Sequence, residues 1–328
     1  MQQAIKFCTA PDGVRIAYAV TGNGPPLVKV GNWFTHLELD WGSPVWGHVL
    51  EGLSEHRQLV RYDVRGTGLS QRDVPDIAFE DLITDLAAVV DAARVHRFPL
   101  FAISQGGAVS IAYTVRHPER VSHLILLGGF ARGLPHRGPE EAGIFATQRS
   151  IIRQGWGSDD PSYRELFSQQ FLPDGGPEQL RWFGELERSS ASAETAEKIY
   201  VATQTVDVRP LLPDIRVPTL VLHCRGDRRV PYEMGCELAA GIPGARFVTL
   251  ESKNHLLLDH EPATEILFDE VASFLGDKQP KKWNRRLRVA ERKLNDMTVK
   301  VEMSPIYKVV GILGVFFTLL SFIVWLLA

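Results

Sequence analysis

The chain has 328 residues, 45% of them hydrophobic, which is enough for one large folded domain or two small ones. Its formal net charge of −3 excludes a protein whose whole surface binds nucleic acid. The charge is unevenly spread: residues 277–308 hold ten Lys or Arg against four Asp or Glu, a net of +6, so residues 1–276 carry about −9. This asymmetry predicts a basic segment with an anionic partner of its own.

Up to residue 132 the chain alternates strand-like and helix-like segments, the pattern of an α/β sheet. Two strands are expected at 5–10 and 15–22, joined by the turn signal Pro11-Asp12-Gly13. Apolar residues at helical spacing predict a helix over 79–93. The other expected elements are strands at 25–31, 58–63, 98–104 and 122–129 and a helix at 105–117.

The pattern changes between residues 133 and 213, where aromatic residues are frequent and β alternation is lacking. We expect a helical insertion between two strands of the sheet. Its aromatic side chains either pack a small core of the insertion or line an apolar pocket over the sheet edge. The sheet pattern then resumes, with strands expected at 218–224 and 246–251 and a last amphipathic helix, so that residues 1–132 and 214–276 form one domain.

The segment 309–328 has no charged residue in twenty positions. A helix of this length spans about 30 Å, the thickness of a bilayer core. We therefore expect a single transmembrane helix at 309–328 that anchors the chain in a membrane, preceded by a basic juxtamembrane connector at 277–308. Because the positive charge precedes this helix and the amino terminus lacks the pattern of a signal peptide, residues 1–276 are expected on the cytoplasmic side.

The stretch Ala102-Ile103-Ser104-Gln105-Gly106 joins an expected buried strand to an expected helix. A nucleophilic serine at such a sharp turn has its hydroxyl exposed at the carboxyl edge of the sheet, and it needs small residues two positions before and after it. Ala102 and Gly106 meet this requirement. The alternative is a serine that ends a strand by chance, so the motif needs partners elsewhere in the chain.

A serine hydroxyl becomes a nucleophile when a histidine takes its proton and a carboxylate orients that histidine. Asp227 follows the strand expected at 218–224, and His255 follows the strand expected at 246–251. The order serine, acid, histidine is the one required on this kind of sheet. We therefore predict Ser104, Asp227 and His255 as the catalytic residues.

Other histidines and the cysteines are given less specific roles. His260 precedes Glu261-Pro262 at an expected helix start and is expected to be structural, and His223 is expected to be a core histidine within a strand. The remaining histidines have no metal-ligand spacing, and no nucleotide-binding motif follows a strand. We predict no metal and no organic cofactor. The three cysteines lack paired spacing, which favours a reducing compartment.

Taken together, these motifs resemble the α/β-hydrolase superfamily, in its branch with a helical cap, over residues 4–276. The motifs that carry the resemblance are DVRGTGLS at 63–70, the serine turn with its helix, and the loops that bear Asp227 and His255. The resemblance implies a mostly parallel, eight-stranded sheet with helices on both faces and a cap at 133–213. Residues 32–41 also resemble a bacterial subgroup whose members often accompany adenylate-cyclase or LuxR-type signalling modules.

The chain departs from the superfamily at the oxyanion loop, where Gly31-Asn32-Trp33 replaces the usual His-Gly-x. An oxyanion hole needs backbone N–H donors, which any residue but proline supplies. By position, these donors are expected to be the N–H groups of Trp33 and Gln105. The ring of Trp33 either crowds the acyl pocket or packs in the core.

The expected function is that of a serine hydrolase that cleaves an ester, thioester or lactone of a lipophilic small molecule through an acyl-enzyme. One alternative is a low-turnover signalling or ligand-binding protein with a protein partner. The other is an acyltransferase or perhydrolase that uses the same triad. Nucleic acid is not an expected partner.

Overall fold

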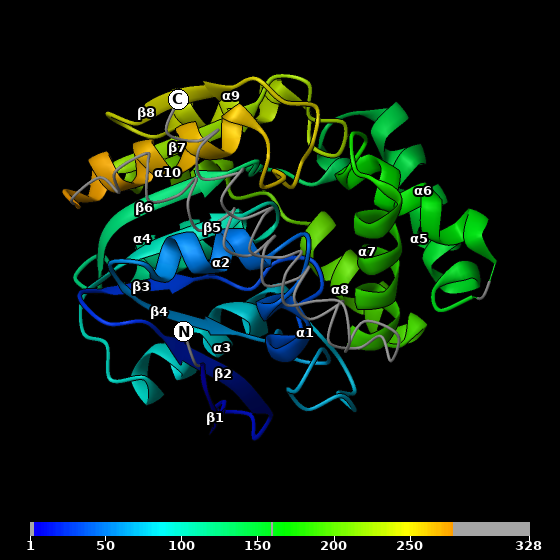
Figure 1. Cartoon of the computed structure of the whole chain (residues 1–328), viewed down its shortest axis with the longest axis horizontal. Coiled ribbons are helices and arrows are strands. Elements are labelled where there is room, and N and C mark those ends of the chain that lie inside the picture. Colours follow the sequence, from blue (N-terminus) through cyan, green and yellow to red (C-terminus); the bar gives the residue numbers. More distant parts are fainter. Residues whose placement is uncertain (1–2, 159, 278–328) are drawn as a thin grey trace, which may run out of the picture. The chain divides into compact units, whose positions relative to one another are not determined.

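The computed structural model describes residues 3–158 and 160–277. These residues contain an eight-stranded sheet. The strand order is β1-β2-β4-β3-β5-β6-β7-β8 (Figure 1). β2 is antiparallel to both of its neighbours, and all other neighbouring strands are parallel. This confirms the mostly parallel sheet expected from the sequence. The strands are β1 Ala4–Thr9, β2 Arg15–Thr21, β3 Pro26–Lys29, β4 Gln58–Tyr62, β5 Phe98–Ile103, β6 Val121–Leu127, β7 Thr219–Cys224 and β8 Arg246–Leu250.

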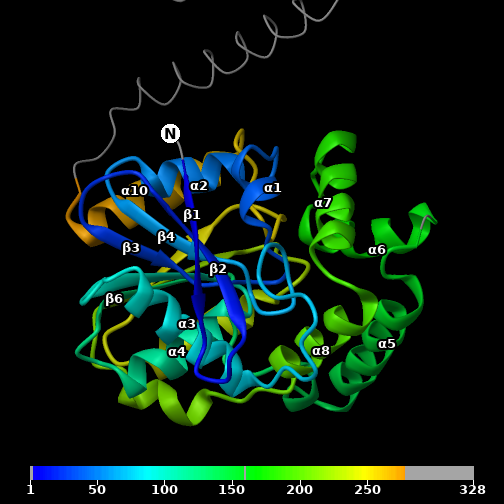
Figure 2. The same cartoon turned by 90° about the horizontal axis from the view of Figure 1, so that it is seen from below.

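Helices cover both faces of the sheet, as expected. In Figure 2, α2 and α10 lie on one face and α3 and α4 on the other. α9 packs along β7 and β8. These helices and the short α1 are α1 Leu37–Trp41, α2 Gly47–Ser54, α3 Phe79–Ala92, α4 Gly106–Arg116, α9 Tyr232–Gly241 and α10 Pro262–Leu275. The sequence pattern predicts α3, α4 and α10 but not α1, α2 or α9.

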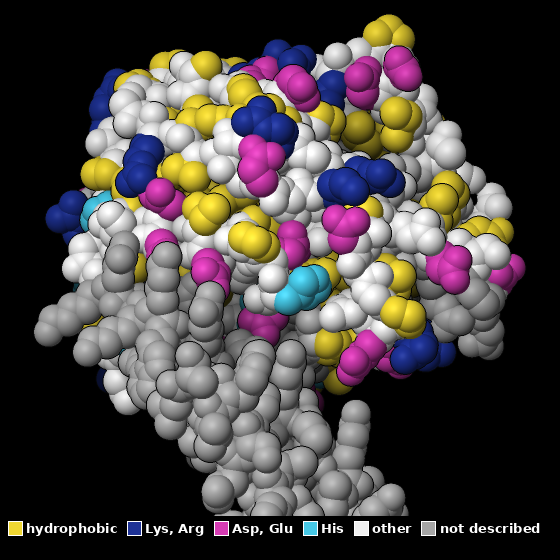
Figure 3. Space-filling view, turned by 45° about the horizontal axis from the view of Figure 1, so that its top comes forward, with side chains coloured by type: hydrophobic (Ala, Val, Ile, Leu, Met, Phe, Trp, Pro, Cys, Tyr) yellow, Lys and Arg dark blue, Asp and Glu magenta, His cyan; other side chains and the backbone are white. Residues whose placement is uncertain are grey.

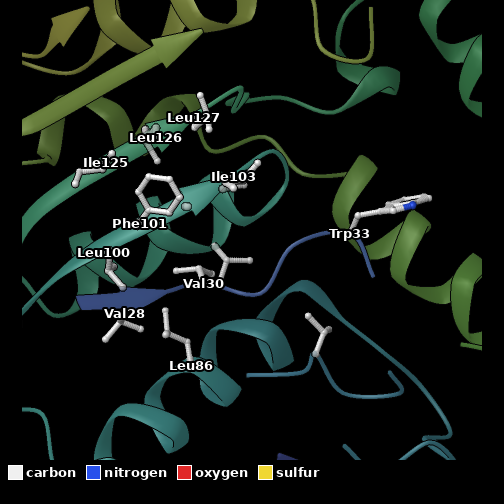
Figure 4. Close-up of a cluster of buried hydrophobic side chains, with 14 of the residues drawn as sticks. Val28, Val30, Trp33, Leu86, Leu100, Phe101, Ile103, Ile125, Leu126 and Leu127 are labelled. Carbon is white, nitrogen blue, oxygen red and sulfur yellow. The ribbon is translucent and has the colours of Figure 1, made fainter. Parts of the chain in front are cut away.

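The central strands are buried on both sides because parallel strands are covered by helices on both faces. All six residues of β5 are buried, which explains why its sequence FPLFAI has no polar alternation. Side chains of β3, β5 and β6 meet those of α3 in the main apolar core (Figure 4). Trp33, on the loop after β3, belongs to the same buried cluster and points toward helices between β6 and β7 (Figure 4).

Four helices occupy the segment between β6 and β7, and they lie together at one side of the sheet (Figure 2). Three of them begin at a proline. Proline is favoured in the first helical turn because it lacks an N–H, and an N–H at this position has no acceptor within the helix. The helices are α5 Pro139–Gly155, α6 Pro161–Phe171, α7 Pro177–Ser190 and α8 Ala193–Gln204. We call these four helices the cap.

No helix within residues 3–158 and 160–277 is long and apolar enough to span a membrane. The expected transmembrane helix at 309–328 and the connector up to 308, apart from Asp277, lie outside the described residues. The last described residue, Asp277, accepts two hydrogen bonds from the Arg57 guanidinium, at 2.5 and 2.7 Å. On the face drawn in Figure 3, basic and acidic side chains are interspersed.

Candidate active site

Ser104 occupies a strained turn between β5 and α4. Its φ is +56°, in the left-handed region that residues with a side chain rarely adopt. The turn is held because the Ser104 N–H donates to the carbonyl of Leu127 at 3.0 Å and the Gly107 N–H donates to the carbonyl of Ser104 at 2.9 Å. Backbone strain of this kind is typical of a nucleophile that must project from the end of a strand.

Gly106 is the position at which this turn requires a glycine. A Cβ placed there would lie 2.9 Å from the carbonyl oxygen of Gly31, closer than real side chains approach. At Gly107 a Cβ would lie 3.6 Å from the nearest atom, the Cα of Gly129, which is ordinary contact. The close approach of the serine turn to the loop after β3 therefore depends on Gly106.

Asp227 and His255 are joined by a short hydrogen bond, although 28 residues separate them. His255 Nδ1–H donates to Asp227 Oδ2 at 2.7 Å. The other carboxylate oxygen, Oδ1, accepts the N–H groups of Arg229 and Val230 at 2.8 and 2.9 Å. Burial opposes ionisation of Asp227, but the charge and hydrogen bond of His255 and the Val230 N–H outweigh it and hold its pKa below the ordinary value.

The Nε2 atom of His255 is buried and has no hydrogen-bond partner among the described residues. This atom is the one that would take a proton from a serine nucleophile. No hydrogen bond joins it to Ser104 Oγ within the described chain, and catalytic hydrogen bonds are often long before substrate binds. Ser104 and His255 are 5% and 1% exposed, so little of either residue is open to bulk water.

The end of β6 connects the serine turn with the acid–histidine pair. A Cβ at Gly128, whose φ is +57°, would lie 3.0 Å from His255 Cε1 and 3.5 Å from Asp227 Oδ2. The adjacent Gly129 lies against the backbone of Ser104. The structure therefore brings the three predicted catalytic residues to one edge of the sheet, around these two glycines.

The loop after β3 places the backbone of Trp33 near this edge. The N–H groups of Trp33 and Gln105 donate no hydrogen bond to another described residue, so both are free for an oxyanion. Next to Trp33, Asn32 is 2% exposed and its Oδ1 accepts a hydrogen bond from the buried Lys29 Nζ at 2.5 Å. Burial lowers the pKa of Lys29 to about 8.

The ring of Trp33 packs under the cap. The sequence left open whether this ring crowds the acyl pocket or packs in the core. Trp33 is 3% exposed, and its Nε1–H donates to Oε1 of Glu187, on α7, at 2.9 Å. Its aromatic neighbours, with ring centroids 4.7 to 6.4 Å away, are Phe34, Trp156, Phe167, Phe171 and Tyr200. Cap aromatic residues thus cover the sheet edge and do not only pack among themselves.

Two ionisable residues beside Trp33, Glu187 and Arg229, were not predicted from the sequence. Burial raises the pKa of Glu187 to about 8, despite the Trp33 hydrogen bond and the charge of Arg229. The guanidinium of Arg229 lies 5.5 Å from the ring of Trp33 and 5.1 Å from that of Phe171. Its place two residues after Asp227 was a signal that could have drawn attention to it.

The competing histidines are placed differently from His255. The side chain of His260 is exposed. His223 is fully buried in β7, where its Nε2–H donates to the carbonyl of Val230 at 2.9 Å, as expected of a core histidine. Its Nδ1, however, has no partner among the described residues, so it is only half satisfied. Within the described residues no group of three His, Cys, Asp or Glu side chains could hold a metal ion.

The family described as alpha/beta hydrolase fold matches residues 35–262. The chain is an α/β-hydrolase. This α/β-hydrolase is 27% identical over 266 residues to a pyrrolizixenacetamide deacetylase of Xenorhabdus hominickii, a match that covers 80% of this chain and 94% of that protein. It is 30% identical over 237 residues to the AB hydrolase superfamily protein YisY of Bacillus subtilis, with 71% and 86% of the two chains covered.

Solved structures give the same result. The esterase RhEst1 from Rhodococcus sp. ECU1013 is similar to the α/β-hydrolase with a TM-score of 0.67 and 26% identity, over 83% of this chain and 98% of that structure. Relatives named as a deacetylase, an AB hydrolase and an esterase support hydrolase activity in this chain. No comparison identifies the bond that it cleaves, because one fold serves many reactions.

Proposed function

We propose that this α/β-hydrolase cleaves a carboxylic ester, thioester or lactone, with Ser104 as the nucleophile. The observation that supports this most is the left-handed Ser104 at the end of β5, on the sheet edge that also holds the hydrogen-bonded Asp227 and His255. Parallel strands place their carboxyl ends at one edge, so residues that follow β5, β7 and β8 converge there.

In the first half of the reaction, Ser104 Oγ attacks the carbonyl carbon while His255 Nε2 takes the hydroxyl proton. Asp227 holds the Nδ1–H tautomer and stabilises the imidazolium that forms. The N–H groups of Trp33 and Gln105 stabilise the oxyanion. When the tetrahedral intermediate collapses, the bond to the leaving oxygen or sulfur breaks, His255 gives its proton to that atom, and an acyl-Ser104 remains.

In the second half, water attacks the acyl carbon and His255 Nε2 takes its proton. The second tetrahedral intermediate collapses, the proton returns to Ser104 Oγ, and the free acid leaves. The acid and the base are held in place for both halves, because both Asp227 oxygens and the His255 backbone N–H have partners.

The direct test is hydrolysis of p-nitrophenyl acetate and p-nitrophenyl butyrate by the wild type and by Ser104→Ala. The variant should lose at least about 10³-fold in kcat, since no nucleophile replaces the serine. Retained turnover in a folded Ser104→Ala protein would contradict the proposal.

A second candidate is a ligand-binding protein that turns over slowly, and the low exposure of the candidate catalytic residues favours it. Ser104 and His255 are both almost fully buried, and no hydrogen bond joins them within the described residues. A panel of short and medium acyl esters separates the two candidates, because slow turnover on every ester together with tight ligand binding supports this one. Added alcohol or peroxide as acceptor tests acyl transfer or perhydrolysis on the same residues.

We further propose that residues 309–328 anchor the enzyme in a membrane, with the catalytic domain on the cytoplasmic side and a lipophilic substrate met there. The uncharged twenty-residue segment and its basic approach support this. A protein shortened after Asp277 keeps the Arg57 ion pair and should leave the membrane fraction. If it stayed there, the anchor proposal would be wrong.

A further inference from the structure

Arg229 brings a positive charge to the covered side of the site. Arg229 is half-buried, and its guanidinium lies over the rings of Trp33 and Phe171, at 5.5 and 5.1 Å. The Phe171 ring is in turn 5.5 Å from the ring of His255. Trp33 provides one expected oxyanion donor, so both rings under the guanidinium belong to the surroundings of the reacting bond. The charge thus lies against two rings, and one of these rings also packs against His255.

The hydrogen bonds of Arg229 leave most of its donors unused. Nη1 donates to the amide oxygens of Gln148 on α5 and Gln170 on α6, both at 3.0 Å. Nε and Nη2 donate to no other described residue, and neither atom is fully buried. A guanidinium has five N–H donors arranged to match a carboxylate, and here the fork is largely open.

No protein carboxylate within the described residues neutralises this cation through a hydrogen bond. Asp227 is committed to His255 and to backbone N–H groups. Glu187 accepts from Trp33, and its raised pKa keeps it mostly protonated at neutral pH. The two partners of Arg229 are neutral amides. Asp227 and Glu187 are near enough to attract this charge but do not bond to it, and an anionic ligand that bonds to it lowers the cost of its burial.

We propose that Arg229 binds a carboxylate of the substrate, so that the enzyme selects esters that combine an apolar or aromatic body with a negative charge. This inference rests on the proposed hydrolase function and names its substrate class. The aromatic rings of Trp33, Phe171 and the cap pack against the apolar body, and Nε and Nη2 of Arg229 bind the carboxylate. A purely structural Arg229, which only links the acid loop to the glutamines of α5 and α6, is the competing account.

Matched ester pairs test the proposal and show whether Arg229 binds a carboxylate in the acyl part or in the leaving group of the ester. Mono-4-nitrophenyl adipate against 4-nitrophenyl hexanoate places the carboxylate in the acyl part. The pair 3-acetoxybenzoate and phenyl acetate places it in the leaving group. In at least one pair, the wild type should favour the anionic ester by about 10- to 100-fold in kcat/KM, the range of a charge-assisted hydrogen bond. Equal rates in both pairs would overturn the proposal.

Variants assign the preference to Arg229. Arg229→Met, which keeps the apolar stem, should abolish the preference, and Arg229→Lys should keep part of it because the charge remains. Arg228→Gln is the matched control, because Arg228 is exposed on the same loop and its loss should leave the ratio unchanged. A preference that survives Arg229→Met in a folded protein would contradict the assignment. If Arg229→Met does not fold, the ratio measured in Arg229→Lys and in the wild type decides.

Binding to Ser104→Ala separates this inference from the hydrolase proposal. Tryptophan fluorescence should report 3-acetoxybenzoate binding at least about 10-fold tighter than phenyl acetate, since Trp33 lies beside Arg229. Anion-selective binding without turnover in the wild type would support Arg229 and contradict the hydrolase. Turnover of both esters without anion preference would do the reverse.

Discussion

Asp227 holds His255 with one carboxylate oxygen and is itself held by the other. Oδ2 accepts His255 Nδ1–H at 2.7 Å, while Oδ1 accepts the N–H groups of Arg229 and Val230. The carboxylate is therefore fixed in rotation, and it fixes the imidazole so that Nε2 is the nitrogen left without a partner.

Asp227→Asn tests this relationship with little change in shape. The amide oxygen would keep the two backbone N–H bonds, so the amide NH₂ would face His255 Nδ1 and impose the wrong tautomer. We expect kcat on p-nitrophenyl butyrate to fall by about 10³- to 10⁴-fold. Asp214→Asn, an exposed acid at the end of the short 3₁₀ helix Arg209–Asp214, is the control and should keep its rate. A loss below tenfold in Asp227→Asn would argue against the assigned role.

The serine turn should tolerate alanine at one of its two glycines and not at the other. Gly106→Ala places a Cβ 2.9 Å from the Gly31 carbonyl and must displace the loop that carries Trp33. We expect at least a tenfold lower kcat and a lower melting temperature. Gly107→Ala makes only ordinary contacts and gains helix propensity of about 1 kcal/mol, so it should keep most of its activity. Similar losses in both variants would contradict this account of the turn.

The Lys29–Asn32 hydrogen bond is expected to position the oxyanion loop. Asn32→Leu has a similar volume but leaves the buried Lys29 Nζ without this acceptor, which should cost about 1–3 kcal/mol in the free energy of unfolding. The kcat should fall with little change in KM, because the Trp33 N–H stabilises the oxyanion and not the ground state. Asn32→Asp keeps an acceptor and should retain more of both properties than Asn32→Leu. Equal losses of kcat and stability in the two variants would show that the Lys29–Asn32 hydrogen bond does not position the oxyanion loop.

Glu187 predicts a dependence of stability on pH. Its folded-state pKa of about 8 lies above the ordinary value of 4.5, so the folded chain keeps a proton that the unfolded chain releases. The contribution to the free energy of unfolding is therefore complete below about pH 4.5, falls as pH rises to about 8, and is lost above it. The total is on the order of a few kcal/mol.

Glu187→Gln isolates this contribution, because it keeps an oxygen acceptor for Trp33 Nε1 and cannot ionise. Wild type and variant should melt at similar temperatures at pH 5, and the variant should be the more stable at pH 9. Melting curves at the two pH values measure the difference. A variant that is less stable than the wild type at pH 9 would mean that Glu187 is ionised and useful in the folded protein.

Much of the fold could be predicted because buried parallel strands and amphipathic helices leave regular patterns. The apolar runs of β5 and β7 and the helical spacing of α3 were sufficient to find those elements. The helices α1, α2 and α9 were missed because they are short or lack a clear polar face, and each forms through contacts with the sheet or with a neighbour.

The candidate catalytic residues could be found in the sequence because each lies in the turn or loop that follows a strand, so their order along the chain carries the information. The surroundings of the site could not. Trp33 and Glu187 are 154 residues apart, and their hydrogen bond depends on how the cap lies over the loop after β3. The stacking of Arg229 on Phe171 likewise depends on α6 meeting the acid loop. No local pattern encodes such contacts.

The most direct test of the central claim is where a fluorophosphonate probe attaches. Digestion with trypsin yields the peptide 98–116, which contains both Ser104 and Ser110, so variants must assign the site. Ser110 is buried in α4 and donates to the Gly106 carbonyl, which makes Ser110→Ala the matched control. We predict one probe per chain on this peptide in the wild type and in Ser110→Ala, and none in Ser104→Ala. Labelling of a folded Ser104→Ala protein, or attachment to a different peptide, would contradict the assignment of Ser104 as the nucleophile.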